Sequence, residues 1–272
     1  MQKTITSFDG VAINYDIEKI SDNFLILLHG AGGDLTAWQN ARQVLHEKGL
    51  STLAIDLRGH GLSGRPNSSS DYDLEKFAKD IFQVIKIEKI QKPIIVGHCL
   101  GGVVAITFHK LYPNIPKGYI LISTTHKAPM YLKILEKISA IIWPAKQLLT
   151  RGDSGQKRFF HRNFDKFIGT SDLDLRRIIS DIRHTSLKSW LLTYESLARF
   201  DGTHALESMQ QPVLIIEGQE DSIFNVFVAQ KINELVKKSK LNIIPNANHI
   251  IVINNPKTLG HEILQFAASL SN

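Results

Sequence analysis

The sequence predicts a single soluble α/β domain whose centre is a parallel sheet buried on both faces. Short apolar runs rich in β-branched residues alternate with longer amphipathic stretches, which is the pattern of repeated strand–helix–strand units. The composition agrees, because 272 residues with 43% hydrophobic and 21% charged residues suffice for one large core and are too balanced for a disordered chain. Between residues 124 and 204 the alternation stops, so we expect an insertion there.

The first two expected strands form a hairpin at residues 3–8 and 12–17. Asp9-Gly10 lies between them and supplies the positive φ angles of a tight turn. Six further apolar runs, each followed by a turn, are expected as strands at 24–29, 53–56, 93–96, 118–122, 212–217 and 240–244. The amphipathic stretches predict helices at 35–48, 74–88, 100–111, 226–238 and 256–270. Pro256 suits the start of the last helix, because a first helical turn does not need its missing N–H.

The expected insertion is helical and basic. A structureless loop of this length is rare in a compact domain, so we expect residues 124–204 to form a helical lid on a core of residues 1–123 and 205–272. Residues 126–205 contain 14 Lys and Arg against 8 Asp and Glu, which accounts for the formal net charge of +6. This charge is a solvated face or a site for an anionic substrate. One set of lid residues is spaced to form an apolar face: Met130, Leu132, Ile134, Leu135, Ile138, Ile141 and Ile142.

Cysteine use and hydropathy limit the compartment and the chemistry. Cys99 is the only cysteine, which excludes an intramolecular disulfide and a cysteine-based metal site. The first residues lack the apolar segment of a signal peptide, and no apolar run approaches the roughly 18 residues of a membrane span. We therefore expect a cytoplasmic protein without stable membrane insertion.

The strongest chemical signal is the segment Gly97-His98-Cys99-Leu100-Gly101-Gly102, which leads from an expected strand into an expected helix. Small residues two positions before and after Cys99 permit a sharp turn that projects its side chain from the carboxyl edge of the sheet. The N-terminus of the helix favours a thiolate at this point. The alternative is that Cys99 is a small buried hydrophobic residue. The glycine spacing favours a nucleophile.

A Gly-rich turn follows the strand expected at 24–29. In the stretch His29-Gly30-Ala31-Gly32-Gly33, a backbone N–H can pair with the one after the nucleophile to hold a developing oxyanion. These donors would be the amides of Ala31 and Leu100. The turn lacks the Walker lysine and the G-x-G-x-x-G pattern of phosphate-binding loops. His29 is interpreted as structural rather than as a base. The residues expected to border the substrate pocket are His29, Gly30, Trp38, His98, Met130 and Ile134.

Two later segments supply an acid and a histidine. Asp221 follows the strand expected at 212–217, and His249 follows the last strand, so both lie at the carboxyl edge of the sheet. Glu217 and Glu220 compete with Asp221 as the acid that orients the histidine, but Asp221 lies clear of the strand. The turn-rich loop from Asp56 to Pro66, which includes His60, is interpreted as structural.

Together these segments resemble the α/β-hydrolase superfamily, specifically its lid-bearing carboxylesterase and enol-lactonase-like branch. The resemblance covers nearly the whole chain and rests on His29-Gly30, Asp56-x-Arg58-Gly59-His60-Gly61-x-Ser63, Gly97-His98-Cys99-Leu100-Gly101-Gly102, Gly218-x-x-Asp221 and His249. It implies an eight-stranded, mostly parallel sheet with helices on both faces, a lid after the sixth strand, and acyl-enzyme hydrolysis without a cofactor or metal.

The departure from the family pattern is cysteine where most members have serine. Dienelactone hydrolases and polyester synthases also have cysteine there, and a Ser→Cys change made to trap an intermediate would look the same. The expected function is hydrolysis of a small-molecule ester, lactone or thioester through Cys99, His249 and Asp221. Acyl transfer or thioesterase activity would use the same triad. A non-catalytic ligand receptor and a nucleic-acid or membrane-surface binder are alternatives of other classes, and no nucleic-acid partner is expected.

Overall fold

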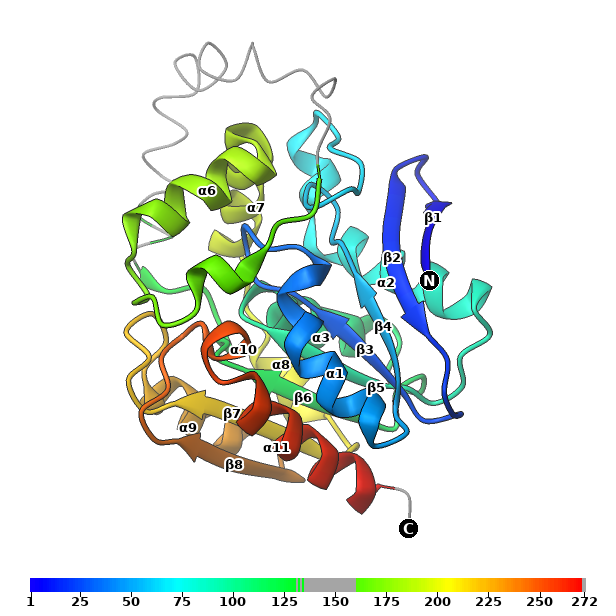
Figure 1. Ribbon diagram of the computed structural model, residues 1–272, viewed down its shortest axis with the longest axis vertical. Helices are drawn as coiled ribbons and strands as arrows, with labels where there is room; N and C mark the ends of the chain where they lie inside the picture. Colours follow the sequence, from blue (N-terminus) through cyan, green and yellow to red (C-terminus); the bar gives the residue numbers. More distant parts are fainter. Residues whose placement is uncertain (131, 133, 135–159, 271–272) are drawn as a thin grey trace.

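The computed structural model describes residues 1–130, 132, 134 and 160–270, and within these residues its centre is one eight-stranded sheet (Figure 1). The strands are β1 (Gln2–Thr6), β2 (Ala12–Glu18), β3 (Phe24–Leu28), β4 (Ser51–Ile55), β5 (Ile94–His98), β6 (Gly118–Ile122), β7 (Val213–Gly218) and β8 (Ser239–Ile244). Their spatial order is β1-β2-β4-β3-β5-β6-β7-β8. The pairs β1–β2 and β2–β4 are antiparallel and all others are parallel. All eight expected strands are therefore confirmed, and none of their ends is shifted by more than two residues.

The central strands are apolar because both faces of the sheet are covered. Every residue of β3, β4, β5, β6 and β7 is buried, whereas the edge strands β1 and β8 contain exposed residues. A parallel strand covered by helices on both sides has no solvent-facing side, so its sequence reads as a continuous apolar run instead of alternating. The mostly parallel α/β architecture expected from the sequence is confirmed.

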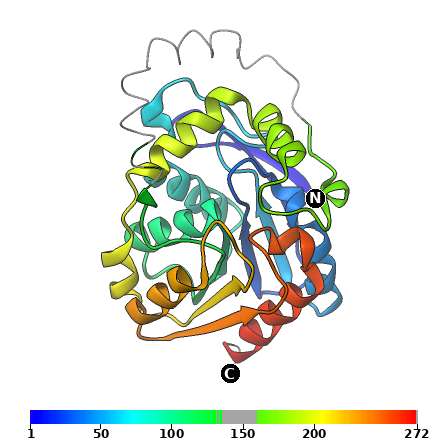
Figure 2. The same cartoon turned by 90° about the vertical axis from the view of Figure 1, so that its left-hand side faces the viewer.

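Helices cover both faces of this sheet. The described helices are η1 (Leu35–Trp38), α1 (Gln39–Glu47), η2 (Ser69–Tyr72), α2 (Leu74–Ile87), α3 (Leu100–Leu111), η3 (Phe164–Phe167), α6 (Leu175–Thr185), α7 (Leu187–Ala198), α8 (Thr203–Ser208), α9 (Val226–Leu235), α10 (Ile251–Asn254) and α11 (Pro256–Ser269). Figure 2 shows α1 and α11 on one side of the sheet and α2, α3 and α9 on the other. Each layer buries its own apolar cluster against the strands.

Two expected helices differ at their ends. The helix expected at 35–48 begins as the 3₁₀ turn η1, because the Asp34 side chain accepts the N–H of Thr36 and caps it. The helix expected at 226–238 ends at Leu235. There Val236 turns to an extended conformation, and its carbonyl accepts the hydroxyl of Ser239, 2.7 Å away, instead of a helical N–H. None of the described helices has both the length and the apolarity that crossing a membrane requires.

The described part of segment 124–204 is mainly helical. Helices α6 and α7 lie beyond the upper edge of the sheet in Figure 1, and side chains of α6 line a pocket together with residues that follow β3 and with His98 at the end of β5. Of the apolar positions expected in this segment, Leu135, Ile138, Ile141 and Ile142 lie outside the described residues. The division into a core and a lid stays a prediction.

Candidate active site

Cys99 lies in a sharp turn between β5 and α3. Its φ of 51° and ψ of −111° are rare for a non-glycine residue, and such strain is typical of functional sites. The flanking glycines make the turn possible: a Cβ on Gly97 would lie 2.2 Å from the carbonyl oxygen of Gly101, and one on Gly101 would lie 2.2 Å from that of Leu28. Strand and helix therefore approach too closely for any side chain, and Cys99 stays partly exposed at the carboxyl edge.

Two backbone N–H groups border this turn. Leu100 is the first residue of α3, where N–H groups have no intrahelical acceptor. Ala31 lies in the turn after β3, which is closed by the hydrogen bond from the N–H of Gly33 to the carbonyl oxygen of Gly30, at 3.0 Å. Within the described residues the N–H groups of Ala31 and Leu100 have no hydrogen-bond acceptor. They are available to a negatively charged oxygen.

His249 and Asp221 form a buried pair. The Nδ1 of His249 lies 2.7 Å from the Oδ2 of Asp221. The other oxygen, Oδ1, accepts the backbone N–H groups of Ile223 and Phe224, each at 2.7 Å. Burial alone would raise the pKa of Asp221, but the hydrogen bond and charge of His249 hold it below its ordinary value. Asp221 is thus an anion that fixes the orientation of the imidazole.

The imidazole of His249 also faces Cys99. Burial disfavours the charged ring, but the negative charge of a Cys99 thiolate and hydrogen bonds with Asp221 and Cys99 raise the pKa of His249 to about 10. His98 supports the loop that carries His249, because its Nε2 lies 2.8 Å from the carbonyl oxygen of His249. Burial, followed by the nearby His249, lowers the pKa of His98 to about 3, so the ring is neutral and donates this hydrogen bond. The structure therefore brings Cys99, His249 and Asp221 together.

The two competing acids have different surroundings. Glu220 is exposed, whereas Glu217 is buried beside Asp221. The Oε1 of Glu217 accepts the hydroxyl of Ser123 and the N–H of Gly218, both at 3.0 Å. Burial and the charge of Asp221 raise the pKa of Glu217 to about 10, so it is protonated at neutral pH and donates to Asp221. Of the three candidates, Asp221 is the one that contacts the imidazole, and Glu217 is its neutral neighbour.

Replacing Glu217 with Gln is expected to stabilise the protein increasingly as pH rises. Because the folded-state pKa of Glu217 lies above its unfolded value, its proton is retained on folding, and the associated stability is fully present only below about pH 4.5. It is lost between that pH and about 10, by up to about 1.4 kcal/mol per pH unit. Thermal melts of wild type and Glu217→Gln at pH 5 and pH 9 should show a gap that widens with pH. A constant gap would mean that Glu217 is ionised.

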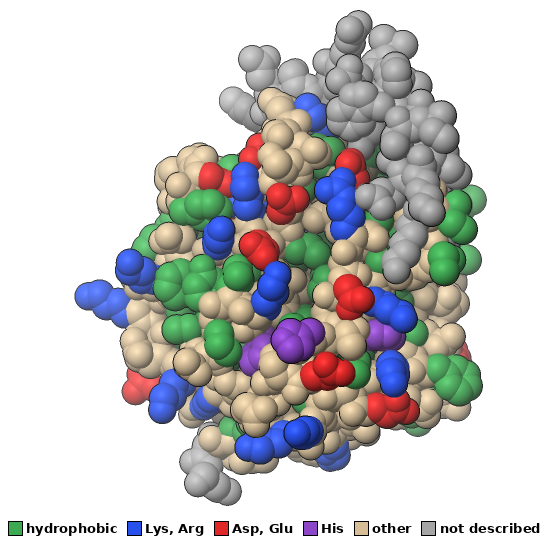
Figure 3. All heavy atoms as spheres, turned by 180° about the vertical axis from the view of Figure 1, so that it is seen from behind, with side chains coloured by type: hydrophobic (Ala, Val, Ile, Leu, Met, Phe, Trp, Pro, Cys, Tyr) green, Lys and Arg blue, Asp and Glu red, His purple; other side chains and the backbone are tan. Residues whose placement is uncertain are grey.

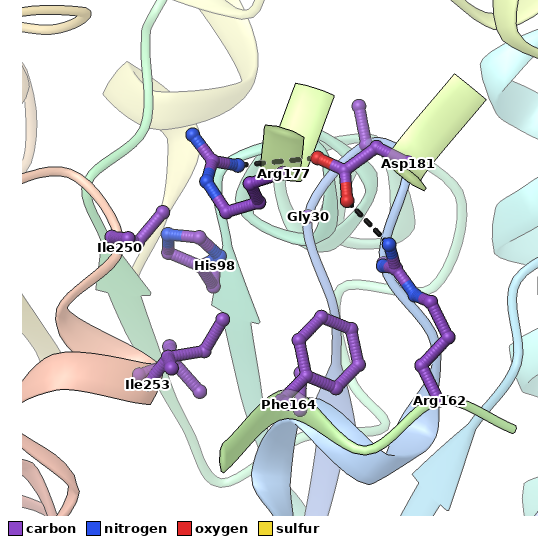
Figure 4. A pocket seen from close by; sticks show the side chains of 12 residues that line it. Gly30, His98, Arg162, Phe164, Arg177, Asp181, Ile250 and Ile253 are labelled. Carbon is purple, nitrogen blue, oxygen red and sulfur yellow. Dashed lines mark hydrogen bonds and ion pairs between the residues drawn. The ribbon is translucent and has the colours of Figure 1, made fainter. Parts of the chain in front are cut away.

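A small pocket opens beside this site, and Figure 4 shows its lining. Gly30, Ala31 and His98 border it, and its apolar wall consists of Ala37, Phe164, Ile250, Val252 and Ile253. Four residues expected here do not line it. His29 and Trp38 are buried beneath the turn, where the Nε2 of His29 accepts the N–H of Leu57, and the side chains of Met130 and Ile134 are exposed to solvent. Sequence spacing placed them on the right elements but on the wrong faces.

Three charged residues of this pocket had no sequence signal. Arg162 and Arg177 approach Asp181 from opposite sides, and each forms an ion pair with it (Figure 4). Arg162 also donates from Nη2 to the carbonyl oxygen of Gly32 in the turn after β3, at 2.7 Å. In the sequence, only the high Lys and Arg content of residues 126–205 indicates that arginines are present here. Since both face the same carboxylate, they do not provide the free positive charge expected for an anionic substrate.

The loop after β4 is tied into the core. The carboxylate of Asp56 accepts the N–H groups of Leu35 and Leu62 at 2.8 Å and so holds two turns together, and His60 is fully buried. Among the described residues, no group of three or more His, Cys, Asp or Glu side chains is placed to hold a metal ion. On the face shown in Figure 3, Lys and Arg side chains alternate with Asp and Glu, so this face presents no extended basic patch.

Comparisons with known proteins identify the family and relatives of this chain. A family model described as alpha/beta hydrolase fold matches residues 23–256. The chain is 24% identical over 258 residues to the "Putative 2-succinyl-6-hydroxy-2,4-cyclohexadiene-1-carboxylate synthase" of Bacillus subtilis, covering 90% of each chain. It is 25% identical over 268 residues to 3-oxoadipate enol-lactonase 2 of Acinetobacter baylyi, covering 96% of this chain and 94% of that protein. A malate-bound esterase structure from Thermogutta terrifontis superimposes with a TM-score of 0.78 at 19% identity over the whole of both chains.

Proposed function

Because the chain belongs to the alpha/beta hydrolase fold family, we propose that it is a carboxylic ester hydrolase, an esterase or lactonase, that acts through Cys99, His249 and Asp221. The observation that carries this proposal is the placement of Cys99 in a strained turn facing the buried His249–Asp221 pair. The curated enol-lactonase relative and the esterase structure support the same reaction class. Segment 124–204 would act as the lid that shapes the pocket.

The proposed reaction forms a thioester and then hydrolyses it. With its proton already held by Nε2 of His249, the sulfur of Cys99 attacks the carbonyl carbon, and the N–H groups of Ala31 and Leu100 stabilise the oxyanion. Collapse of the tetrahedral intermediate breaks the bond to the alkoxide, which takes the proton from His249. A water molecule then gives a proton to the neutral His249 and attacks the thioester, and departure of the acid restores the thiolate beside the protonated ring. Asp221 holds the imidazole in the required tautomer throughout.

The pocket lining favours an uncharged acyl group. Its wall is apolar, and its two arginines are already paired with Asp181. A carboxylate on the substrate would have to compete with Asp181 for them and would lose its hydration on entry. Neutral esters are therefore the proposed substrates, in place of the anionic ones that the lid composition alone favours.

The test combines turnover with detection of the intermediate. Wild type should hydrolyse short p-nitrophenyl esters or a lactone, and p-nitrophenyl butyrate should be a better substrate than p-nitrophenyl hemisuccinate, which adds a carboxylate at similar length. Mass spectrometry of acid-quenched samples should find the acyl group on the peptide that contains Cys99. Iodoacetamide treatment beforehand should abolish both signals. Turnover that survives complete alkylation of Cys99 would refute a thioester mechanism.

Acyl transfer is the second candidate because a thioester reacts with other nucleophiles as well as with water. Adding an alcohol or a thiol to the butyrate assay separates the two. If transfer product outweighs free acid at moderate acceptor concentration, the protein is a transferase that uses the same three residues.

A further inference from the structure

The segment that precedes α6 is bound to both loops that carry the proposed acid and histidine. This segment, residues 169–172, ends at Asp172, whose side chain is buried although it lies outside the triad. We propose that Asp172 is a positioning residue that holds the Asp221 loop and the His249 loop at one fixed spacing. This inference rests on the proposed function, since it concerns the alignment of the same imidazole.

Each carboxylate oxygen of Asp172 serves one loop. Its Oδ1 accepts the backbone N–H of His249 at 2.9 Å. Its Oδ2 accepts both the N–H of Ser222, at 2.9 Å, and the hydroxyl of Ser222, at 2.8 Å. Ser222 directly follows Asp221, and a carboxylate has the rigid geometry needed to connect two backbone segments. One side chain from a third element therefore binds both loops, in addition to the direct hydrogen bond from the N–H of Glu220 to the carbonyl oxygen of Ala247, at 2.8 Å.

The residues before Asp172 strengthen this attachment to the histidine loop. The carbonyl oxygen of Thr170 accepts the side-chain amides of Asn248 and Asn254, each at 3.0 Å. The N–H of Gly169 donates to the Oδ1 of Asn254 at 2.8 Å. Asn248 precedes His249 in the chain and Asn254 follows it, so residues 169–172 bind the chain both before and after His249.

Arg177 connects the same segment to the turn that holds the proposed oxyanion. Its Nη2 donates to the carbonyl oxygen of Asp172, and its Nη1 pairs with Asp181 at 3.1 Å. Asp181 in turn binds Arg162, which donates to Gly32 beside Ala31. A continuous set of charged contacts thus runs from the histidine loop through Asp172 and Arg177 to the oxyanion turn (Figure 4 shows the Arg177–Asp181–Arg162 part). The same segment therefore contacts the histidine loop directly and the oxyanion turn through two arginines.

The test replaces Asp172 with Ala and with Asn, and uses Asp174→Asn as the matched control. Asp174 lies two residues away and loses the same charge, but its side chain caps α6 by accepting the N–H of Arg177, which Asn also does. The readouts are kcat and KM on the best ester, and the rate of Cys99 alkylation by iodoacetamide, with His249→Ala as the reference for a cysteine without its partner.

Asp172→Ala should lower kcat by roughly 30- to 100-fold, because a displacement of about 1 Å costs about this much. KM should change by less than about twofold, since the pocket wall is untouched, and the alkylation rate should fall towards that of His249→Ala. Asp172→Asn should lose less because its amide oxygen keeps one acceptor. Asp174→Asn should match wild type.

If Asp172→Ala does not fold, Arg177→Met tests the same connection with the carboxylate in place. A smaller loss of kcat and a slower alkylation of Cys99 are expected, and KM is not a readout for this variant because Arg177 lines the pocket. A folded Asp172→Ala with wild-type kcat and alkylation overturns the inference, as does an equal loss in Asp174→Asn or a loss confined to KM. If wild type hydrolyses no ester and His249→Ala alkylates as fast as wild type, the proposed function and this inference fail together. Turnover in wild type with no effect at Asp172 removes only the inference.

Discussion

Cys99→Ala is expected to reduce kcat/KM for p-nitrophenyl butyrate by at least roughly 10³-fold, which would leave only what binding and the oxyanion donors supply. The reason is that Cys99 is the one described nucleophile that faces the imidazole of His249 from the carboxyl edge of the sheet. Neither chain neighbour can replace Cys99 as the nucleophile, because His98 is hydrogen-bonded to the carbonyl oxygen of His249 and Leu100 is apolar. The measurement is steady-state turnover, with circular dichroism to show that the fold is retained.

Cys99→Ser is the informative companion. It keeps a hydrogen-bonding nucleophile of similar size in the same strained backbone, so it should retain more activity than Cys99→Ala. Equal hydrolysis by wild type and Cys99→Ala would show that the turn is not the reacting site. If neither wild type nor Cys99→Ala turns over any ester while Cys99→Ser does, the cysteine marks a transferase, a ligand receptor or a trapping substitution.

The proposed nucleophile could be found from the sequence because its signal is local. Gly97 and Gly101 are close to Cys99 in the chain, and the steric reason for both glycines acts within the same turn. Asp221 and His249 lie far apart, but each follows an apolar run, and parallel strands bring their carboxyl ends to one edge. The order of the strands is not needed to bring Asp221 and His249 together, because both follow strands that end at the same edge of the sheet.

The contacts of Asp172 could not be predicted in this way. Its partners Ser222 and His249 lie 50 and 77 residues further along the chain, and no periodic pattern in segment 124–204 marks which carboxylate turns inward. Four of the six expected pocket residues do not line the pocket, for a related reason. Trp38 is on the expected helix, but a short 3₁₀ turn at its start rotates the indole into the core, where none of its surface is exposed. Protonation of Glu217 likewise depends on burial beside Asp221, which sequence spacing does not report.

Asp221→Asn should lower kcat/KM by roughly 10²- to 10⁴-fold, whereas Glu217→Gln should leave it within about threefold of wild type. Asn would place either an amide N–H or a neutral oxygen against Nδ1 of His249, so the imidazole would lose its anionic partner and its fixed tautomer. The protonated Glu217 is already neutral, and Gln reproduces its contacts: an oxygen for Ser123 and Gly218, and an N–H for Asp221.

The two variants make the same chemical change, a carboxyl group replaced by an amide, at two adjoining buried positions. Only the ionised carboxyl group should therefore matter, and kcat/KM measured from pH 5 to pH 11 distinguishes the two assignments. The pKa of His249 depends partly on Asp221, so Asp221→Asn should also move the histidine-dependent limb of this profile to lower pH. If Glu217→Gln instead caused the larger loss, Glu217 would be the acid that orients His249. Asp221 would then be the residue that keeps its neighbour protonated, and the roles of the two carboxyl groups would be exchanged.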